Sequence, residues 1–382
     1  MAAVRILHLQ SSFNLGGQQS RTVRLMNHFG GQAEHVVLSA VSDAYGARDA
    51  IDKKVKVSFP GVDAPALAGF PSMGRYRRLA AYMKKFNLVL SYNWGAIDGV
   101  MAHTLLSRSM GLPPLIHHED GFNDDEVTRL KKRRNWFRTI ALQRSNALVV
   151  PSKTLENIAR TVWHQPLEKI ARFPNGIDIA HYHRRAQRGS FPGFVKREGE
   201  IVVGTVAGLR AVKNLPRLVR AVATAGPNVR LAIAGEGSER GTIMAEAERL
   251  GIADRVMMPG FLRDPARYIG LFDIFALSSD SEQYPISLVE AMASKIPVVA
   301  TDVGDVRNIL ASENHPFVVA RDDENGLADA IRTLATEAAL RQKLGDANRY
   351  LATSQYDEIT MLARYRQLYG SAMKRADFAR QG

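Results

Sequence analysis

The sequence contains no cysteine. This absence excludes disulfide bonds, zinc sites with thiolate ligands and cysteine nucleophiles. It agrees with a reducing compartment, and we expect a cytoplasmic protein.

Long hydrophobic runs are missing as well. No run reaches the ~18 apolar residues of a membrane-spanning helix, and the apolar stretch at 4–9 lacks the length and cleavage pattern of a signal peptide. Acidic residues are outnumbered, with 38 Asp and Glu against 51 Lys and Arg, which gives a net charge of +13. This excess predicts attraction to anions, namely nucleotides, acidic glycans, nucleic acid or the inner face of the plasma membrane.

The chain has 382 residues, of which 46% are apolar. This length suggests two domains of roughly 150–200 residues each. Short apolar runs alternate with amphipathic, helix-like stretches, which predicts an α/β fold with doubly wound parallel sheets. We expect strands at 5–9, 34–39, 88–91, 114–117 and 147–150, and again at 201–206, 230–234, 256–258, 274–277, 297–301 and 317–319. A basic stretch at 184–199, rich in helix breakers, separates the two sets and is predicted to be a linker.

The segment from Glu282 to Ala293 places two carboxylates eight residues apart around a predicted helix start. Pro285 suits the beginning of a helix, so the amides of Ile286 and Ser287 would be free to bind a phosphate. Glu290 would lie one turn inside the helix, and Glu282 in the loop before it. The simpler reading of two isolated glutamates is a pair of solvated acids.

Together with its flanks, this segment at 278–304 resembles the signature of the retaining glycosyltransferases of family 4. The resemblance implies the GT-B fold, in which two Rossmann-like domains face a central cleft. It implies an acceptor-side domain at 1–183, a nucleotide-sugar domain at 200–355, and a C-terminal helix at 356–382 that crosses back to the first domain. It also implies a donor of the UDP or GDP type, no metal cofactor, and a glycan or lipid-linked acceptor in surface polysaccharide or glycolipid synthesis.

Family members carry an arginine and, five residues later, a lysine that hold the diphosphate. Lys213 matches the lysine, whereas Gly208 stands at the arginine position, and we expect Arg210 to take over its role. Two solvated cations near a helix start are the alternative, but a cation is disfavoured at a helix N-terminus without an anionic ligand.

Gly16 and Gly17 lie between the first strand and a helix predicted from about Ser20. They form either a tight turn or, as the resemblance implies, a loop that approaches the donor phosphates or the acceptor.

His117, His118 and Asp120 end a strand of the first domain. In relatives, a histidine or an aspartate at this strand end lies near the transferred sugar, and Asp120 matches that position best. Adjacent strand residues point to opposite faces, so we expect only one histidine to face the cleft. The resemblance implies front-side attack without a protein nucleophile, and the nearby acids Asp124, Asp125 and Glu126 are not expected to bind a metal.

A basic segment with interspersed aromatic residues covers 129–138, and a second covers 75–85. The first contains Lys131, Lys132, Arg133, Arg134 and Trp136. Such a helix could contact an anionic membrane or an acidic acceptor, or it could be a core helix with a solvated basic face.

Three alternatives to a transferase remain: a non-catalytic nucleotide-binding relative, which Gly208 favours, a sugar-nucleotide epimerase, and a nucleic-acid-binding protein. The last rests on charge alone, so we expect no nucleic-acid partner.

Overall fold

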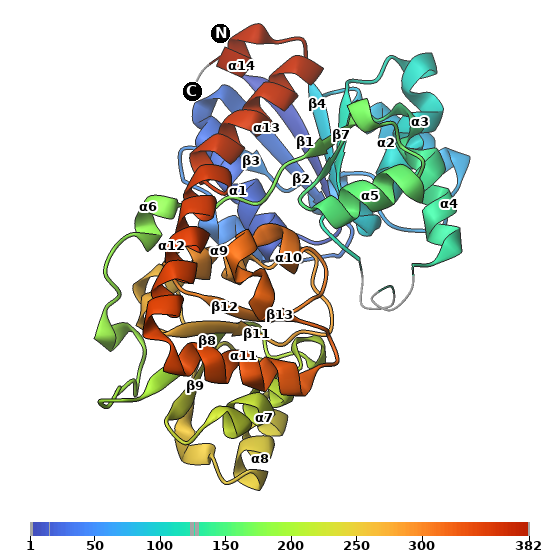
Figure 1. Cartoon of the computed structure of the whole chain (residues 1–382). Coiled ribbons are helices and arrows are strands. Elements are labelled where there is room, and N and C mark those ends of the chain that lie inside the picture. The colour runs from blue at the N-terminus through green and yellow to red at the C-terminus, as the bar shows by residue number, and fades with distance from the viewer. Residues whose placement is uncertain (1–2, 15, 123–125, 127–129, 381–382) are drawn as a thin grey trace. The chain divides into compact units, whose positions relative to one another are not determined.

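The computed structural model describes residues 3–14, 16–122, 126 and 130–380. It divides into two compact units, of which the first comprises residues 1–175 and 360–382 and the second residues 176–359 (Figure 1). The sequence predicted a linker at 184–199, but this stretch packs into the second unit, whose boundary lies at 175/176. Phe191 is buried there against Tyr268 and Phe272, and Lys196 pairs with Asp273.

The first unit contains a seven-stranded parallel sheet in the order β3-β2-β1-β4-β5-β6-β7. Its strands are β1 (Val4–Gln10), β2 (Ala33–Ser39), β3 (Lys56–Ser58), β4 (Leu88–Tyr92), β5 (Leu115–His118), β6 (Ala147–Val150) and β7 (Ile170–Arg172). Sequence patterning missed β3 and β7. Each has only three residues and neither is fully buried, so no hydrophobic run marks them.

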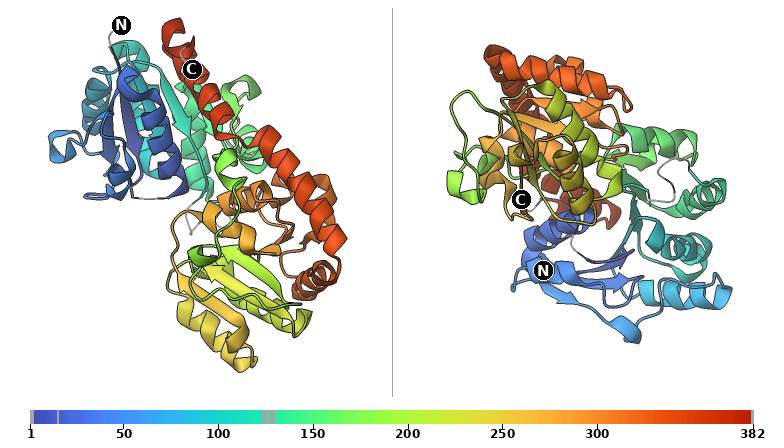
Figure 2. Two further views of the ribbon diagram at one scale, coloured as in Figure 1. Left: turned by 90° about the vertical axis from the view of Figure 1, so that its left-hand side faces the viewer. Right: turned by 90° about the horizontal axis from the view of Figure 1, so that it is seen from below.

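Helices cover both faces of this sheet (Figures 1 and 2). The helices are α1 (Gly17–Phe29), α2 (Met73–Met83), α3 (Ile97–Met110), α4 (Lys132–Ala141), α5 (Lys153–Thr161), α13 (Glu358–Ala372) and α14 (Ala376–Arg380). One buried cluster joins one face to α2, α3 and α5, and another joins the opposite face to α1, α13 and α14. The C-terminal residues from Thr360 onward therefore complete the core of the N-terminal unit.

The second unit contains a six-stranded parallel sheet in the order β10-β9-β8-β11-β12-β13. Its strands are β8 (Ile201–Val206), β9 (Val229–Ala234), β10 (Val256–Gly260), β11 (Ile274–Leu277), β12 (Val298–Thr301) and β13 (Val318–Val319). The predicted strands of this half all form, with bounds that differ by at most two residues.

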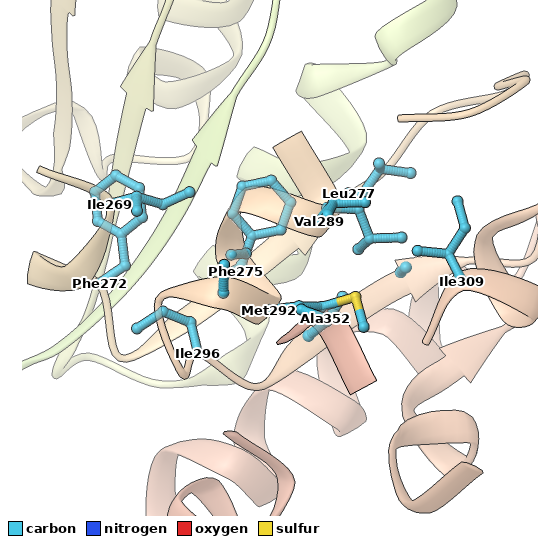
Figure 3. Close-up of a cluster of buried hydrophobic side chains, with 14 of the residues drawn as sticks. Ile269, Phe272, Phe275, Leu277, Val289, Met292, Ile296, Ile309 and Ala352 are labelled. Atoms are coloured by element: carbon cyan, nitrogen blue, oxygen red, sulfur yellow. The ribbon is translucent and has the colours of Figure 1, made fainter. Parts of the chain in front are cut away.

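The helices of the second unit form a layer on each side of its sheet. They are α6 (Ile179–Tyr182), α7 (Leu215–Ala225), α8 (Arg240–Arg249), α9 (Ile286–Ala293), α10 (Val306–Ile309), α11 (Glu324–Thr336) and α12 (Ala338–Gln355). One core packs α7, α8 and α11 against the sheet. The other packs α9, α10 and α12 against the opposite face, where Phe275, Val289 and Met292 lie side by side (Figure 3). Two parallel sheets with helices on both faces confirm the predicted α/β fold.

None of the helices in the described part of the chain has both the length and the hydrophobicity to cross a bilayer.

Candidate nucleotide-sugar site

The loop after β8 runs from Ala207 to Arg210 and leads into a short 3-10 turn, Ala211–Lys213. Two glycines in the loop after β9, Gly235 and Gly237, pack closely against it. A Cβ at Gly235 would lie 1.8 Å from the carbonyl oxygen of Ala207, and a Cβ at Gly237 would lie 2.3 Å from that of Leu209. Both glycines also have φ of +156°. They let two strand-end loops touch, which fixes the backbone path towards Lys213.

Lys213 and Glu282 form an ion pair at 2.5 Å between Nζ and Oε1. Lys213 follows β8, whereas Glu282 follows β11, the strand beside it in the sheet. Ser279 Oγ donates a second hydrogen bond to the same carboxylate oxygen at 2.7 Å. The carboxyl ends of parallel strands meet at one edge, so the two predicted site residues come together although 69 positions separate them in sequence.

The two loops are joined by further polar contacts around this pair. Ser278 Oγ donates to the carbonyl oxygens of Lys213 and Asn214, each at 3.1 Å. Asp280 accepts from Asn214 Nδ2 at 3.1 Å and pairs with Arg217 at 2.9 Å. These contacts hold the backbone on both sides of Lys213 and Glu282 in place before any ligand binds.

A third loop, which follows β12, packs behind Glu282. Gly304 in this loop has φ of +56°, and a Cβ there would lie 2.0 Å from the carbonyl oxygen of Glu282. Only glycine allows both this left-handed conformation and this close approach.

Helix α9 begins at Ile286, as predicted, with Pro285 in the capping position. Within the described residues, the amides of Ile286 and Ser287 donate no hydrogen bond to the protein. Both residues are half-buried. Free amides at a helix N-terminus favour an anion, so this helix start has the properties that phosphate binding requires.

Glu290 lies one turn inside α9 and is also predicted to contact the donor. Its Oε1 accepts a hydrogen bond from the hydroxyl of Tyr182 at 2.8 Å. Tyr182 is the last residue of the short helix α6, in the part of the chain where the sequence predicted a domain boundary. No sequence motif pointed to this tyrosine, because its role depends on a contact across 108 residues.

Gly208 and Arg210 are both exposed, on either side of the buried Leu209. A Cβ at Gly208 would meet no atom of the described residues within 4 Å. The amide of Arg210 donates to the carbonyl oxygen of Gly208 at 2.9 Å, and the replacement role of the Arg210 side chain stays a prediction.

In the first unit, the loop after β1 contains Gly16 and Gly17. The helix that follows begins at Gly17, three residues earlier than predicted, and Gly16 caps it in an extended conformation. A Cβ at Gly16 would lie 2.8 Å from Gln19 Oε1. The Gln19 side chain thus folds over the helix start. Its Nε2 donates to the carbonyl oxygen of Ser12 at 2.9 Å, which ties the first turn of α1 to the loop before it.

The expectation that one of the two histidines faces a ligand is wrong. His117 and His118 point to opposite faces of β5, as predicted, but each face is covered, and the residues are 0% and 1% exposed. His118 Nε2 bonds the hydroxyl of Tyr369 at 2.9 Å, and burial holds its pKa well below the ordinary value. His117 Nδ1 bonds Ser91 Oγ at 2.9 Å. Both imidazoles are core residues of the sheet.

Asp120, two residues beyond β5, keeps 13% of its side chain exposed. Arg21 of α1 binds both of its carboxylate oxygens, at 2.6 and 2.8 Å. Burial by itself lowers the pKa of this guanidinium, but the charge of Asp120 outweighs it and raises the pKa. The two hydrogen bonds from Arg21 hold the carboxyl group of Asp120 in one orientation. Sequence reasoning missed Arg21, whose position in a helix gives no sign of an ion pair across 99 residues.

The basic segment forms α4 from Lys132 onward, and Arg129, Asp124 and Asp125 lie outside the described residues. Arg134 pairs with Glu126 at 2.8 Å, and the fully buried Arg138 pairs with Glu119 at 3.1 Å. Lys131, Lys132, Arg133 and Trp136 are exposed. In the residues that the structure describes, no three His, Asp or Glu side chains gather into a group that could hold a metal ion.

The two Rossmann-like units, with the paired Lys213 and Glu282 at the strand ends of the second, define a GT-B fold of the glycosyltransferase type. Two family profiles match successive halves: "Glycosyltransferase Family 4" matches residues 15–181, and "Glycosyl transferases group 1" matches residues 188–350. The chain belongs to glycosyltransferase family 4.

Individual relatives are distant. The chain is 24% identical over 235 residues to N-acetyl-alpha-D-glucosaminyl L-malate synthase of Bacillus anthracis, a match that spans 61% of each protein. It is 23% identical over 265 residues to alpha-D-kanosaminyltransferase of Streptomyces kanamyceticus, over 66% of this chain and 69% of that protein. The crystal structure of Anabaena HepE in complex with UDP superimposes with a TM-score of 0.79 at 18% identity, over 96% of this chain and 100% of HepE.

Proposed function

We propose that the protein is a retaining glycosyltransferase that moves a hexosyl group from a nucleotide-diphosphate sugar to a glycan or lipid-linked acceptor. The observation that carries this proposal is the Lys213–Glu282 pair, followed four residues after Glu282 by the amides of Ile286 and Ser287 that start α9. Lys213 would bind the diphosphate, assisted by Arg210, and the amides of Ile286 and Ser287 would bind its oxygens. Glu290 would accept hydrogen bonds from the ribose and Glu282 from the hexose.

In the proposed reaction, the bond between the anomeric carbon and the phosphate oxygen breaks, and its electron pair stays on the diphosphate. The acceptor hydroxyl attacks from the same face, and its proton passes to the leaving phosphate oxygen, so the anomeric configuration is retained. Lys213 stabilises the charge that develops on the phosphate. Because Arg21 occupies both oxygens of Asp120, we assign Asp120 an electrostatic and positioning role, not that of a base or nucleophile.

The donor is of the UDP or GDP type in this proposal, with no metal cofactor. UDP is the first choice, since Anabaena HepE, which shares the fold, has been crystallised with UDP and with UDP-glucose. We place the reaction in the cytoplasm, with peripheral contact to the inner face of the plasma membrane when the acceptor is lipid-linked. Surface polysaccharide or glycolipid synthesis is the corresponding process.

Thermal unfolding with uridine, guanosine, adenosine and thymidine diphosphates and their sugars tests the donor site. A ligand at about 100 times its Kd adds roughly 2.7 kcal/mol to the free energy of unfolding. We expect one nucleotide class to stabilise the protein, and Lys213→Ala to lose that shift relative to its own unliganded baseline. No shift with any nucleotide would refute the donor site. NMR analysis of the product linkage tests retention, which an inverted anomeric centre would contradict.

The alternative is a non-catalytic relative that binds the nucleotide without transfer, and Gly208 at the usual arginine position is the feature that favours it. Glu282→Gln separates the two functions. In a transferase, this change abolishes turnover while the nucleotide-induced thermal shift changes little. A wild-type protein that binds a nucleotide sugar, yet neither transfers nor hydrolyses it with any acceptor extract, would support the binding protein.

A further inference from the structure

The first unit contains a pocket of about 640 Å³ that the proposed donor site does not use. It lies between the loop before α2, the turn after β4 and the start of α4. Strands β1 and β4 are neighbours in the sheet, and the chain winds away from them in opposite directions. Ligands of open parallel sheets bind at such a switch point, beyond the carboxyl ends of the strands.

The turn after β4 touches the loop after β1. Gly95 donates its amide to Ser11 Oγ at 3.0 Å, and a Cβ at Gly95 would lie 2.7 Å from that side chain. The pocket wall at Gly95 therefore contacts Ser11, the first residue after β1.

Aromatic rings form one part of the pocket wall. Trp94 and Phe137 pack edge to face, with ring centres 5.8 Å apart. The guanidinium groups of Arg134 and Arg138 lie over the Trp94 ring at 5.1 and 4.9 Å. These contacts fix the indole of Trp94, which lines the pocket and remains partly exposed. A fixed indole suits the apolar face of a sugar ring.

The rim of the pocket is basic. Lys131, Arg133 and Arg134 line it together with Trp136, which is 65% exposed. The acidic residue in the lining, Asp98, is already engaged, because Arg75 pairs with it at 2.5 Å and Tyr76 donates to it at 3.1 Å. Arg134 is paired with Glu126, so the exposed Arg133 supplies positive charge beside two indoles, a combination that favours an anionic ring-shaped ligand.

We propose that this pocket is an acceptor subsite for a sugar that carries an anionic group, either a uronate carboxylate or a phosphate ester. The sugar ring stacks on Trp94 and Trp136, and the anion pairs with Arg133. This inference rests on the proposed transferase function and specifies the class of its acceptor. A flat membrane surface is a poorer match, since it would leave the recessed Trp94 unused.

Fluorescence anisotropy of labelled oligosaccharides tests the subsite in the full-length protein. The probes are a glucuronate-containing tetrasaccharide, a phosphorylated tetrasaccharide and a neutral tetrasaccharide of equal length. We expect at least one acidic probe to bind about tenfold or more tightly than the neutral probe. Arg133→Glu should remove this preference. Arg77→Glu, an exposed arginine of α2 outside the pocket lining, is the matched control and should leave it within about twofold.

Trp136→Ala should weaken acidic and neutral probes alike, because stacking does not depend on charge. Equal binding of all probes, or equal effects of Arg133→Glu and Arg77→Glu, would overturn the proposal. So would binding to anionic phospholipid vesicles that Arg133→Glu abolishes, if no soluble probe binds. The donor-induced thermal shift of each variant is measured in parallel. A wild-type shift with no probe binding refutes the subsite alone, whereas a missing shift in the wild type refutes the donor site.

Discussion

Lys213 and Glu282 approach to 2.5 Å, and their side chains are only 17% and 9% exposed. Because little solvent reaches the pair, removal of one partner leaves the other charge poorly compensated. We expect Lys213→Met to reduce the free energy of unfolding by about 2–4 kcal/mol, and Lys213→Met/Glu282→Gln to cost less than the sum of the single changes. Urea denaturation of the four proteins measures this coupling.

Lys196 provides the control for this double-mutant cycle. It pairs with Asp273 at 2.6 Å, but its side chain is 37% exposed. Lys196→Met should therefore cost about 1 kcal/mol or less. Strictly additive effects of the Lys213 and Glu282 changes would show that the two residues are not energetically coupled.

Tyr182 donates a hydrogen bond to Oε1 of Glu290, the residue that we propose binds the ribose of the donor. Tyr182→Phe removes this hydrogen bond, worth about 1 kcal/mol, so we expect the KM for the nucleotide sugar to rise about threefold to tenfold with little change in kcat. Steady-state kinetics with varied donor test this. Tyr350→Phe, at a tyrosine that is 79% exposed on α12, should change neither constant. A fall in kcat with an unchanged KM would contradict a role in donor binding.

The sequence predicted the elements of the site well and their contacts poorly. The helix start at Ile286 follows from local chemistry, since a proline precedes a helix-like run, and it was correctly predicted. The partners Tyr182 and Arg21 were missed, because nothing in their own segments indicates which distant side chain they meet. The burial of His117 and His118 was missed for the same reason. Alternation shows that adjacent side chains point to opposite faces, but it does not show that helices cover both faces.

Arg21 is 3% exposed and binds both oxygens of Asp120 and also Asn175 Oδ1 at 2.6 Å. Arg21→Met strips a largely buried carboxylate of its counter-ion, so we expect a loss of about 3–5 kcal/mol in the free energy of unfolding. Arg21→Met/Asp120→Asn should recover part of this loss, because no charge remains unpaired. Chemical denaturation measures both. If the double variant is less stable than Arg21→Met, the ion pair is not the source of the effect.

Acid should destabilise the first unit below about pH 6.5, where unfolded histidines take up protons. Burial lowers the pKa of His35 to about 4, and burial together with the charges of His35 and His118 lowers the pKa of His8. His8 Nε2 and His35 Nδ1 share a hydrogen bond of 2.9 Å, so the folded state resists protonation. The unfolded state therefore binds more protons between pH 6.5 and 4, and stability falls as the pH falls.

Each such histidine contributes a slope of about 1.4 kcal/mol per pH unit in this window. Denaturation at pH 7.5, 6, 5 and 4.5 gives the slope, and His35→Gln should make it shallower. A slope that is the same in His35→Gln would assign the acid sensitivity to other groups.

Alanine substitutions at Gly304 and Gly251 distinguish the cost of backbone strain from an effect on the geometry of the donor site. Both have positive φ, of +56° and +68°. A Cβ at Gly304 would press on the carbonyl of Glu282 at 2.0 Å, whereas a Cβ at Gly251 would meet nothing within 4 Å. An alanine in the left-handed region costs about 1–2 kcal/mol at either position.

We expect Gly251→Ala to show this loss alone, with native donor affinity. Gly304→Ala should also displace the loop with Glu282 and weaken donor binding about tenfold or more, since small displacements at a site are costly. Isothermal titration with the stabilising nucleotide sugar compares the two. Native affinity in Gly304→Ala would show that the loop after β12 does not position Glu282 for the donor.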